Sequence, residues 1–246
     1  MTGRAVRRGA VDARAVRPGA ARRGEAGPPG GEAPGWQPIA RDDLLGDALD
    51  VAPQLLNKIL AHGGRAGRIV EVEAYRGADD PGSHAYRGMT RRNATMFGRA
   101  GLLYVYFTYG MHWCANVVCQ TDGVPHAVLL RALAPMAGID DMFAARVAAR
   151  RPEDLCSGPA KLCQAMGLDG KDDGADLVNG DRGVRLLSDG TAPPEEPSTG
   201  LRIGLSAGAE HPWRFWVPGD RNVSRARPGG RRGSGPGIPV AGQGPG

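Results

Sequence analysis

The amino-acid sequence predicts an α+β fold, a single domain with a curved, mostly antiparallel, roll-like β-sheet flanked by helices. Two observations lead to this prediction. Segments with the patterns of strands follow one another in runs and do not alternate regularly with helices, which is typical of α+β proteins. Both ends of the chain lack hydrophobic periodicity, so we expect the domain to lie between them.

The two ends are predicted to be disordered tails. Residues 1–37 are rich in Gly, Ala, Arg and Pro, and residues 221–246 are similar in composition. Neither segment has enough apolar surface to offset the entropy lost when its backbone is ordered. We therefore expect one domain over residues 38–220.

The first half of this domain should contain one helix followed by three strands. Apolar residues at helical spacing predict a helix over residues 51–60, and alternation of apolar and polar residues predicts a strand over 68–75. Residues 102–109 and 113–119 are rich in aromatic and β-branched residues, which favours two strands joined by a turn at Gly110.

The second half should begin with a strand over residues 127–132 and two helices over 139–149 and 160–166. Pro159 and Gly167 are suited to the start and end of the second helix. Three further short strands are expected over residues 184–187, 201–205 and 214–217.

The net charge of +5 is unevenly distributed along the chain. Residues 1–37 contribute +4 and residues 221–246 contribute +5, which leaves −4 for the predicted domain. The basic isoelectric point therefore comes from the tails and is no evidence that the domain binds nucleic acid.

Several classes of protein are disfavoured by the composition. No apolar stretch has the length of a membrane span, and no apolar segment near the N-terminus indicates secretion. The four cysteines have neither C-x-x-C spacing nor paired histidines, so we expect buried free thiols in a reducing cytosol and no metal site. These residues are Cys114, Cys119, Cys156 and Cys163.

Two glutamates should share one face of the strand over residues 68–75. Side chains two residues apart on a strand point the same way, which places Glu71, Glu73 and Tyr75 together. Paired carboxylates suit hydrolysis of a glycosidic bond, because one of them can activate water. The alternative is a solvated strand face with two ordinary acids.

Aromatic residues concentrate around the predicted turn at Gly110. Tyr104 and Tyr106 share one strand face, and Tyr109 stands at the strand end, where a turn would expose it. Aromatic side chains stack on nucleobases and can wedge into a duplex. The alternative is the packed core of a β-sheet.

The segment over residues 87–99 is basic, within a domain that is otherwise acidic. It contains Arg87, Arg91, Arg92 and Arg99 and no acidic residue. Arginines beside exposed aromatic residues suit phosphate contacts combined with base insertion. The alternative is an ordinary solvated loop.

Together these segments form a long string that resembles the methylpurine-DNA glycosylase family. The string over residues 67–135 reads GRIVEVEAYRGADDPGSHAYRGMTRRNATMFGRAGLLYVYFTYGMHWCANVVCQTDGVPHAVLLRALAP, and DLCSGPAKLCQAMG and RIGLSAGAEHPWRFWVPG follow in the order of the family. The resemblance runs from about Leu44 to Pro218. One departure is Asn57, which stands where the family frequently has glycine.

The resemblance implies a catalytic role for two residues and a base-binding role for four. Glu73 matches the glutamate that activates the attacking water, and Arg131 matches the arginine that helps to position it. The flipped base would be held between aromatic rings, with Tyr75 and His84 on one side and Tyr106 on the other. Asn116 matches the asparagine that disfavours undamaged guanine by crowding its exocyclic amino group.

The resemblance also implies contacts with the DNA around the flipped base. Tyr109 matches the tyrosine that enters the space vacated in the duplex, and Met111 would pack against the partner strand. Arg91 and Arg92 are the expected phosphate contacts.

The function expected from this resemblance is a monofunctional DNA N-glycosylase that initiates base excision repair. It would remove alkylated or deaminated purines from double-stranded DNA without a cofactor, as a monomer in the bacterial cytoplasm. Rival hypotheses are a non-catalytic nucleic-acid-binding domain, a carbohydrate hydrolase that uses Glu71 and Glu73, and a structural domain.

Overall fold

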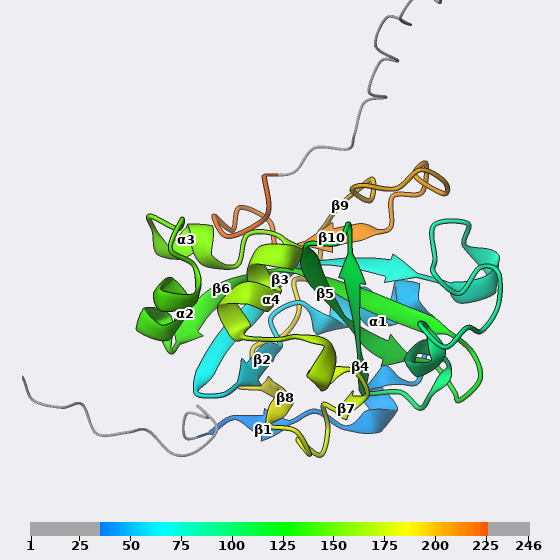
Figure 1. Cartoon of the computed structure of the whole chain (residues 1–246), viewed down its shortest axis with the longest axis horizontal. Helices are drawn as coiled ribbons and strands as arrows, with labels where there is room; N and C mark the ends of the chain where they lie inside the picture. The colour runs from blue at the N-terminus through cyan, green and yellow to red at the C-terminus, as the bar shows by residue number, and fades with distance from the viewer. Residues whose placement is uncertain (1–34, 226–246) are drawn as a thin grey trace, which may run out of the picture.

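Ten strands form one curled antiparallel sheet, and its two longest strands lie at its centre (Figure 1). These are β3 (Arg65–Tyr75) and β6 (His126–Ala137), which pair along most of their lengths. The computed structural model describes residues 35–225. The predicted tails therefore lie almost entirely outside the described residues, and the expected α+β fold is confirmed.

The sheet has the order β1-β8-β2-β3-β6-β5-β4-β7, and β10 pairs with both β3 and β9. The shorter strands are β1 (Gln37–Pro38), β2 (Ile59–His62), β4 (Leu102–Thr108), β5 (His112–Cys119), β7 (Ala175–Asp176), β8 (Val184–Ser188), β9 (Ser198–Gly200) and β10 (Arg214–Trp216). Because β10 pairs with the last third of β3, that end of β3 is enclosed on both sides.

Short helices cover the sheet. They are α1 (Ala48–Leu55), α2 (Ile139–Ala145), α3 (Pro152–Leu155) and α4 (Pro159–Met166), with the 3-10 helices η1 (Arg41–Leu44), η2 (Gly77–Asp79), η3 (Ala94–Phe97) and η4 (Gly170–Asp172). Helix α1 packs on β3, while α4 packs on β5 and β6 with α2 and α3 beside it. Within residues 35–225, no helix is long and apolar enough to cross a membrane.

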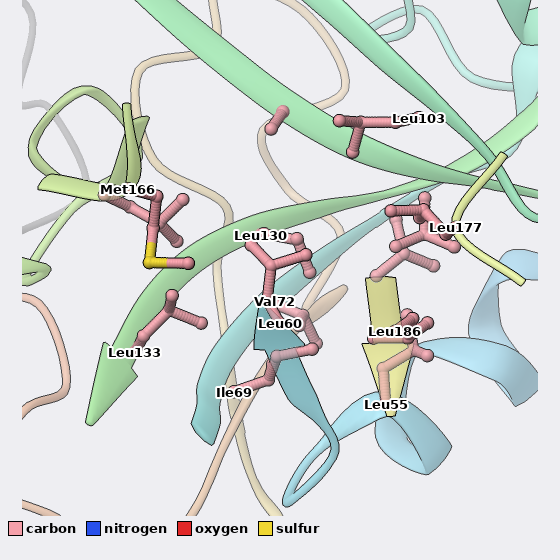
Figure 2. Close-up of a cluster of buried hydrophobic side chains, with 14 of the residues drawn as sticks. Leu55, Leu60, Ile69, Val72, Leu103, Leu130, Leu133, Met166, Leu177 and Leu186 are labelled. Carbon is pink, nitrogen blue, oxygen red and sulfur yellow. The ribbon is translucent and has the colours of Figure 1, made fainter. Parts of the chain in front are cut away.

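The main hydrophobic core lies between the sheet and these helices. Figure 2 shows Val72 and Leu130 from the two central strands in the middle of this cluster, which also contains Leu55 of α1 and Met166 of α4. The four cysteines are buried and free, as predicted, and Cys119, Cys156 and Cys163 belong to this core. The core fixes the central strands rigidly, so that side chains at their ends are held in defined positions.

Three of the predicted elements were wrong in extent or type. The helix predicted over residues 51–60 ends at Leu55, because Asn57 has a left-handed φ of 66° and residues 59–62 pair with β3 and β8 as a strand. The helix predicted over 139–149 ends at Ala145. The strand predicted over 201–205 is an irregular loop, and only residues 198–200 pair with β10.

Candidate active site

A cavity of about 390 Å³ opens at one end of the central strands. It is lined by strands β3 to β6, the start of α4, and loop residues 82–84, 203–205 and Ser224. This volume lies within the range of about 300–1,000 Å³ that is usual for small-molecule sites. Six of the ten residues predicted for the site border it, namely Tyr75, His84, Tyr106, Tyr109, Asn116 and Arg131.

Glu73 lies directly behind the cavity wall and is fully buried. Its Oε1 accepts a hydrogen bond from the backbone N–H of Ile203 at 2.7 Å, and its Oε2 accepts one from the Tyr75 hydroxyl at 2.9 Å. Burial raises the pKa of Glu73, although the charge of Arg131 opposes the shift. A carboxylate with a raised pKa is a better proton acceptor, and all three of its partners border the cavity.

Arg131 contacts both glutamates because the pairing of β3 with β6 is irregular. The register shifts on either side of Glu71, so that Val70 is the extra residue on β3 and Arg131 is the extra residue on β6. Irregularities of this kind redirect side chains beside functional sites. The Arg131 guanidinium donates from Nε to Glu71 at 2.9 Å and pairs through Nη1 with Glu73 at 3.0 Å.

The two glutamates share a face, as predicted, but they are not equivalent. Glu71 accepts hydrogen bonds from Arg131, from Arg214 at 3.0 Å, and from both the backbone N–H and the hydroxyl of Ser224. Three of these bonds reach Oε1 and one, from the Ser224 N–H, reaches Oε2, and two of the donors are guanidinium groups. Glu73 has three partners and keeps an acceptor site for a reacting molecule. This difference argues against a carbohydrate hydrolase with paired carboxylates.

Aromatic rings form much of the cavity wall. His84 and Tyr106 meet edge to face with centroids 4.4 Å apart, and Tyr106 stacks on Tyr104 at 5.4 Å. The Tyr104 hydroxyl lies 3.1 Å from His84 Nδ1, and burial lowers the pKa of His84. The imidazole is therefore neutral near neutral pH, and the wall presents flat, uncharged surfaces suited to stacking on a planar ring.

Asn116 is buried in the wall formed by β5. Its side-chain amide donates to the backbone carbonyl of Tyr104 at 3.1 Å, which fixes the orientation of the carboxamide. A rigid polar group at the cavity wall can exclude a ligand that carries a bulky substituent at that point.

The turn between β4 and β5 extends beyond the mouth of the cavity. Tyr109 is 79% exposed and Met111 is 68% exposed. Tyr109 and Gly110 both have positive φ values, 51° and 65°, and the Met111 N–H donates to the Thr108 carbonyl. A positive φ is unusual for tyrosine, and such strain is found at functional sites. The predicted turn at Gly110 is confirmed.

The basic segment lies beside this turn. Arg91 and Arg92 are exposed, and Arg92 donates from Nη2 to the backbone carbonyl of Phe107 at 2.6 Å. This bond ties Arg92 to Phe107 of β4, two residues before Tyr109, and the charge of Arg92 adds to the burial that lowers the pKa of His84 in the cavity wall. The structure thus connects Arg92 to the strand that leads into the exposed turn.

Several site residues were missed by the sequence reasoning. Ser224 borders the cavity and is buried, although the domain was expected to end at residue 220. Ile203 supplies a backbone N–H to Glu73 from a loop that was predicted to be a strand. A backbone donor has no side-chain signature, and a single serine in a Gly- and Arg-rich segment gives no pattern to detect.

Among residues 35–225, no three His, Cys, Asp or Glu side chains are grouped so that they could hold a metal ion. Lys161 on α4, which follows the cavity-lining Ala160, is exposed and donates to Ser157.

The sequence matches a described family and several curated relatives. The family model for methylpurine-DNA glycosylase (MPG) matches residues 42–221. A protein of Burkholderia lata named "Putative 3-methyladenine DNA glycosylase" is 57% identical over 198 residues, which cover 79% of this chain and 96% of that protein. Proteins of the same name from Streptomyces avermitilis and Agrobacterium fabrum are 45% and 49% identical, covering 79% and 73% of this chain and 94% and 88% of theirs.

Proposed function

The chain belongs to the methylpurine-DNA glycosylase family, and from this premise we propose that it excises alkylated or deaminated purines from double-stranded DNA by water attack on the N-glycosidic bond. In this proposal it acts on the DNA of the bacterial nucleoid as a monofunctional, monomeric enzyme that initiates base excision repair. The bond between the sugar and the base is broken, and the strand itself is left intact.

The aromatic cavity would hold the extruded base. Tyr75 and His84 would contact one side of the purine and Tyr106 the other, since all three rings border the cavity. Alkylation places positive charge on a purine, and aromatic faces attract cations. Asn116 would disfavour undamaged guanine by crowding its exocyclic amino group, because its carboxamide is fixed at the wall.

Glu73 would be the general base and Arg131 would position the water. A water molecule forms a bond from its oxygen to the anomeric carbon of the sugar, and its proton passes to the free acceptor site of Glu73. The bond from that carbon to the purine nitrogen breaks, and its electron pair leaves with the base. A positive charge on an alkylated purine makes it a better leaving group. This chemistry needs no lysine and no cofactor.

Tyr109 and Met111 would fill the space that the extruded base leaves in the duplex. Both are highly exposed on a turn whose backbone is fixed by β4 and β5. Arg91 and Arg92 are exposed, Arg92 is tied to β4 next to this turn, and both would contact phosphates of the same DNA. Extrusion costs a few kcal/mol, and least for a damaged base that pairs poorly, which makes flipping a selectivity step.

One observation carries the proposal above all others: a fully buried carboxylate with a free acceptor site lies behind the aromatic cavity. A non-catalytic DNA-binding domain has no need of such a group, because burying a carboxylate is costly and its charge repels phosphates. An enzyme that must accept a proton from water does need one.

The proposal is tested by measuring base release from duplexes that each carry one lesion. The lesions are 7-methylguanine, hypoxanthine and ethenoadenine, with undamaged guanine as the control. We expect an abasic product, from at least one lesion, that breaks only after treatment with hot alkali. Tight lesion binding without release would support the non-catalytic alternative, and direct strand breakage would contradict a monofunctional mechanism.

A further inference from the structure

Ser224 connects the end of the described chain to the centre of the candidate active site. Its backbone N–H donates to Glu71 Oε2 at 2.8 Å, and its hydroxyl donates to Glu71 Oε1 at 3.0 Å. The same hydroxyl accepts a hydrogen bond from Arg131 Nη2 at 3.3 Å. Ser224 is buried and borders the cavity. One short side chain therefore contacts both Glu71 and Arg131.

These contacts complete the anchoring of the Arg131 guanidinium. Nε binds Glu71, Nη1 binds Glu73, and Nη2 binds Ser224, so every nitrogen of the group has a partner. A planar guanidinium held at three points can neither rotate nor slide between its two carboxylates. The geometry of the contact with Glu73 thus depends on residues that do not touch Glu73.

Glu71 and Glu73 compete for the positive charge of Arg131. Glu71 has a second cation of its own, since Arg214 of β10 donates to it at 3.0 Å, and Ser224 adds two neutral donors. These partners satisfy Glu71 without drawing Arg131 further from Glu73. If one donor to Glu71 is lost, Arg131 is expected to move toward Glu71 and to stabilise ionised Glu73 less.

We propose that Ser224 and Glu71 are positioning residues, which hold Arg131 in the contact with Glu73 that water attack requires. This inference rests on the proposed function. It assigns Glu71 a role other than that of acid or base, and it extends the working site to residue 224.

The pH dependence of base release should report this arrangement. Arg131 lowers the pKa of Glu73, and Glu71 raises it. The titratable or charged groups that face Glu73 or its partners are Glu71 and Tyr75 of β3, Tyr106 of β4, Cys114 of β5, Arg131 of β6, Arg214 of β10 and Arg202 of the loop between β9 and β10. Ser224 contacts two of these groups, Glu71 and Arg131, so loss of its hydroxyl changes the position of both charges relative to Glu73.

The experiment measures single-turnover base release against pH on one lesion duplex, with the full-length chain. Ser224→Ala should lower the plateau rate by roughly 10- to 100-fold, since a displacement of about 1 Å can have effects of this size. It should also move the acidic limb of the pH–rate profile, the range over which the rate rises with pH, to higher pH. Arg131 then stabilises ionised Glu73 less. Ser224→Thr keeps the hydroxyl and should restore the limb.

Glu71→Gln should move the acidic limb in the opposite direction, to lower pH, because the repulsion between the two carboxylates is removed. A residue with a merely structural role would not produce shifts of opposite sign. Ser188→Ala is the matched control, because Ser188 lies on β8 and its hydroxyl accepts only a local hydrogen bond from Gly190.

A limb and a rate in Ser224→Ala that match the native protein would overturn the inference. If Ser224→Ala fails to fold, the pH–rate profile of Glu71→Gln tests the inference instead. An acidic limb at the same pH as in the native protein, or at a higher pH, would overturn the inference. Glu73→Gln separates the two claims: if this variant is inactive while Ser224→Ala is native-like, only the positioning role fails. If Glu73→Gln is as active as the native protein, the proposed function itself fails.

Discussion

Replacing Asp80 by asparagine should destabilise the protein strongly, because it breaks a fully buried ion pair. Neither Asp80 nor Arg202 has any exposed side-chain surface. Asp80 receives two hydrogen bonds from the Arg202 guanidinium, including one of 2.7 Å, and one each from the backbone N–H groups of Arg76 and Gly82. The variant leaves the Arg202 charge buried without a charged partner, among a neutral amide, two backbone carbonyls and the rings of Tyr75 and Trp213.

The expected loss follows from the burial of both groups. Removing one partner of a buried pair costs about 3–5 kcal/mol, since the remaining charge is uncompensated. A domain of this kind has a total stability of roughly 5–15 kcal/mol. At about 2–4 °C per kcal/mol for a domain of this size, the melting temperature should fall by roughly 6–20 °C.

Asp80→Asn should also slow base release, because Arg202 packs against residues of the candidate active site. The guanidinium lies 4.6 Å from the centroid of the Tyr75 ring, and the next residue, Ile203, donates to Glu73. Base release at a temperature where Asp80→Asn is still folded should therefore be slower than in the native protein.

The assay is thermal denaturation followed by single-turnover base release at low temperature. Asp154→Asn is the matched control, because Asp154 pairs with Arg151 at the surface and its loss should leave the melting temperature unchanged within error. A fall of less than about 3 °C in Asp80→Asn would refute the reasoning, since it would mean that the buried pair contributes no more than a surface pair.

Three further predictions concern the mechanism and the tails. The rate of base release should increase with pH as Glu73 ionises and then level off, because only the ionised carboxylate accepts a proton. Burial raises the pKa of Glu73, and a rate that falls through its titration would contradict the assignment. Tyr109→Ser should slow release more on well-paired than on poorly paired lesions, and an equal loss on both would show that Tyr109 acts elsewhere. Residues 1–34 carry a net charge of +4 and residues 226–246 one of +3, which leaves −2 for residues 35–225. A chain of residues 35–225 should therefore bind duplex DNA with a weaker salt dependence, while its single-turnover rate of base release stays unchanged. Identical salt slopes for the two chains would mean that the tails do not contact DNA.

The sheet was predictable to the extent that strand patterns are local. The segments around Glu73, Tyr106 and Asn116 alternate or are rich in aromatic and β-branched residues, and each forms a strand close to the expected bounds. The apolar residues at 59–60 fit the spacing of a helix as well as that of a strand. They form a strand because they pair with β3 and β8. Asn57 has a left-handed φ of 66°, so the chain leaves the helix before these residues.

The candidate site was predictable where it depends on side chains and hidden where it depends on tertiary contacts. The shared face of Glu71 and Glu73 follows from strand geometry, but their different environments do not. Those environments arise from the register shifts around Arg131 and from Ser224, which is 153 residues distant from Glu71 in the chain. Neither feature leaves a pattern in the sequence.

Single-turnover base release by Glu73→Gln tests the central claim most directly. The amide keeps the shape of the side chain but cannot accept the proton of water, so the rate should fall by at least about 100-fold. Lesion-DNA affinity should be unchanged or tighter, because a negative charge near phosphates is removed. Glu210→Gln, at an exposed glutamate, is the matched control and should retain the native rate. A rate for Glu73→Gln within tenfold of the native protein would contradict the assignment of Glu73 as the base.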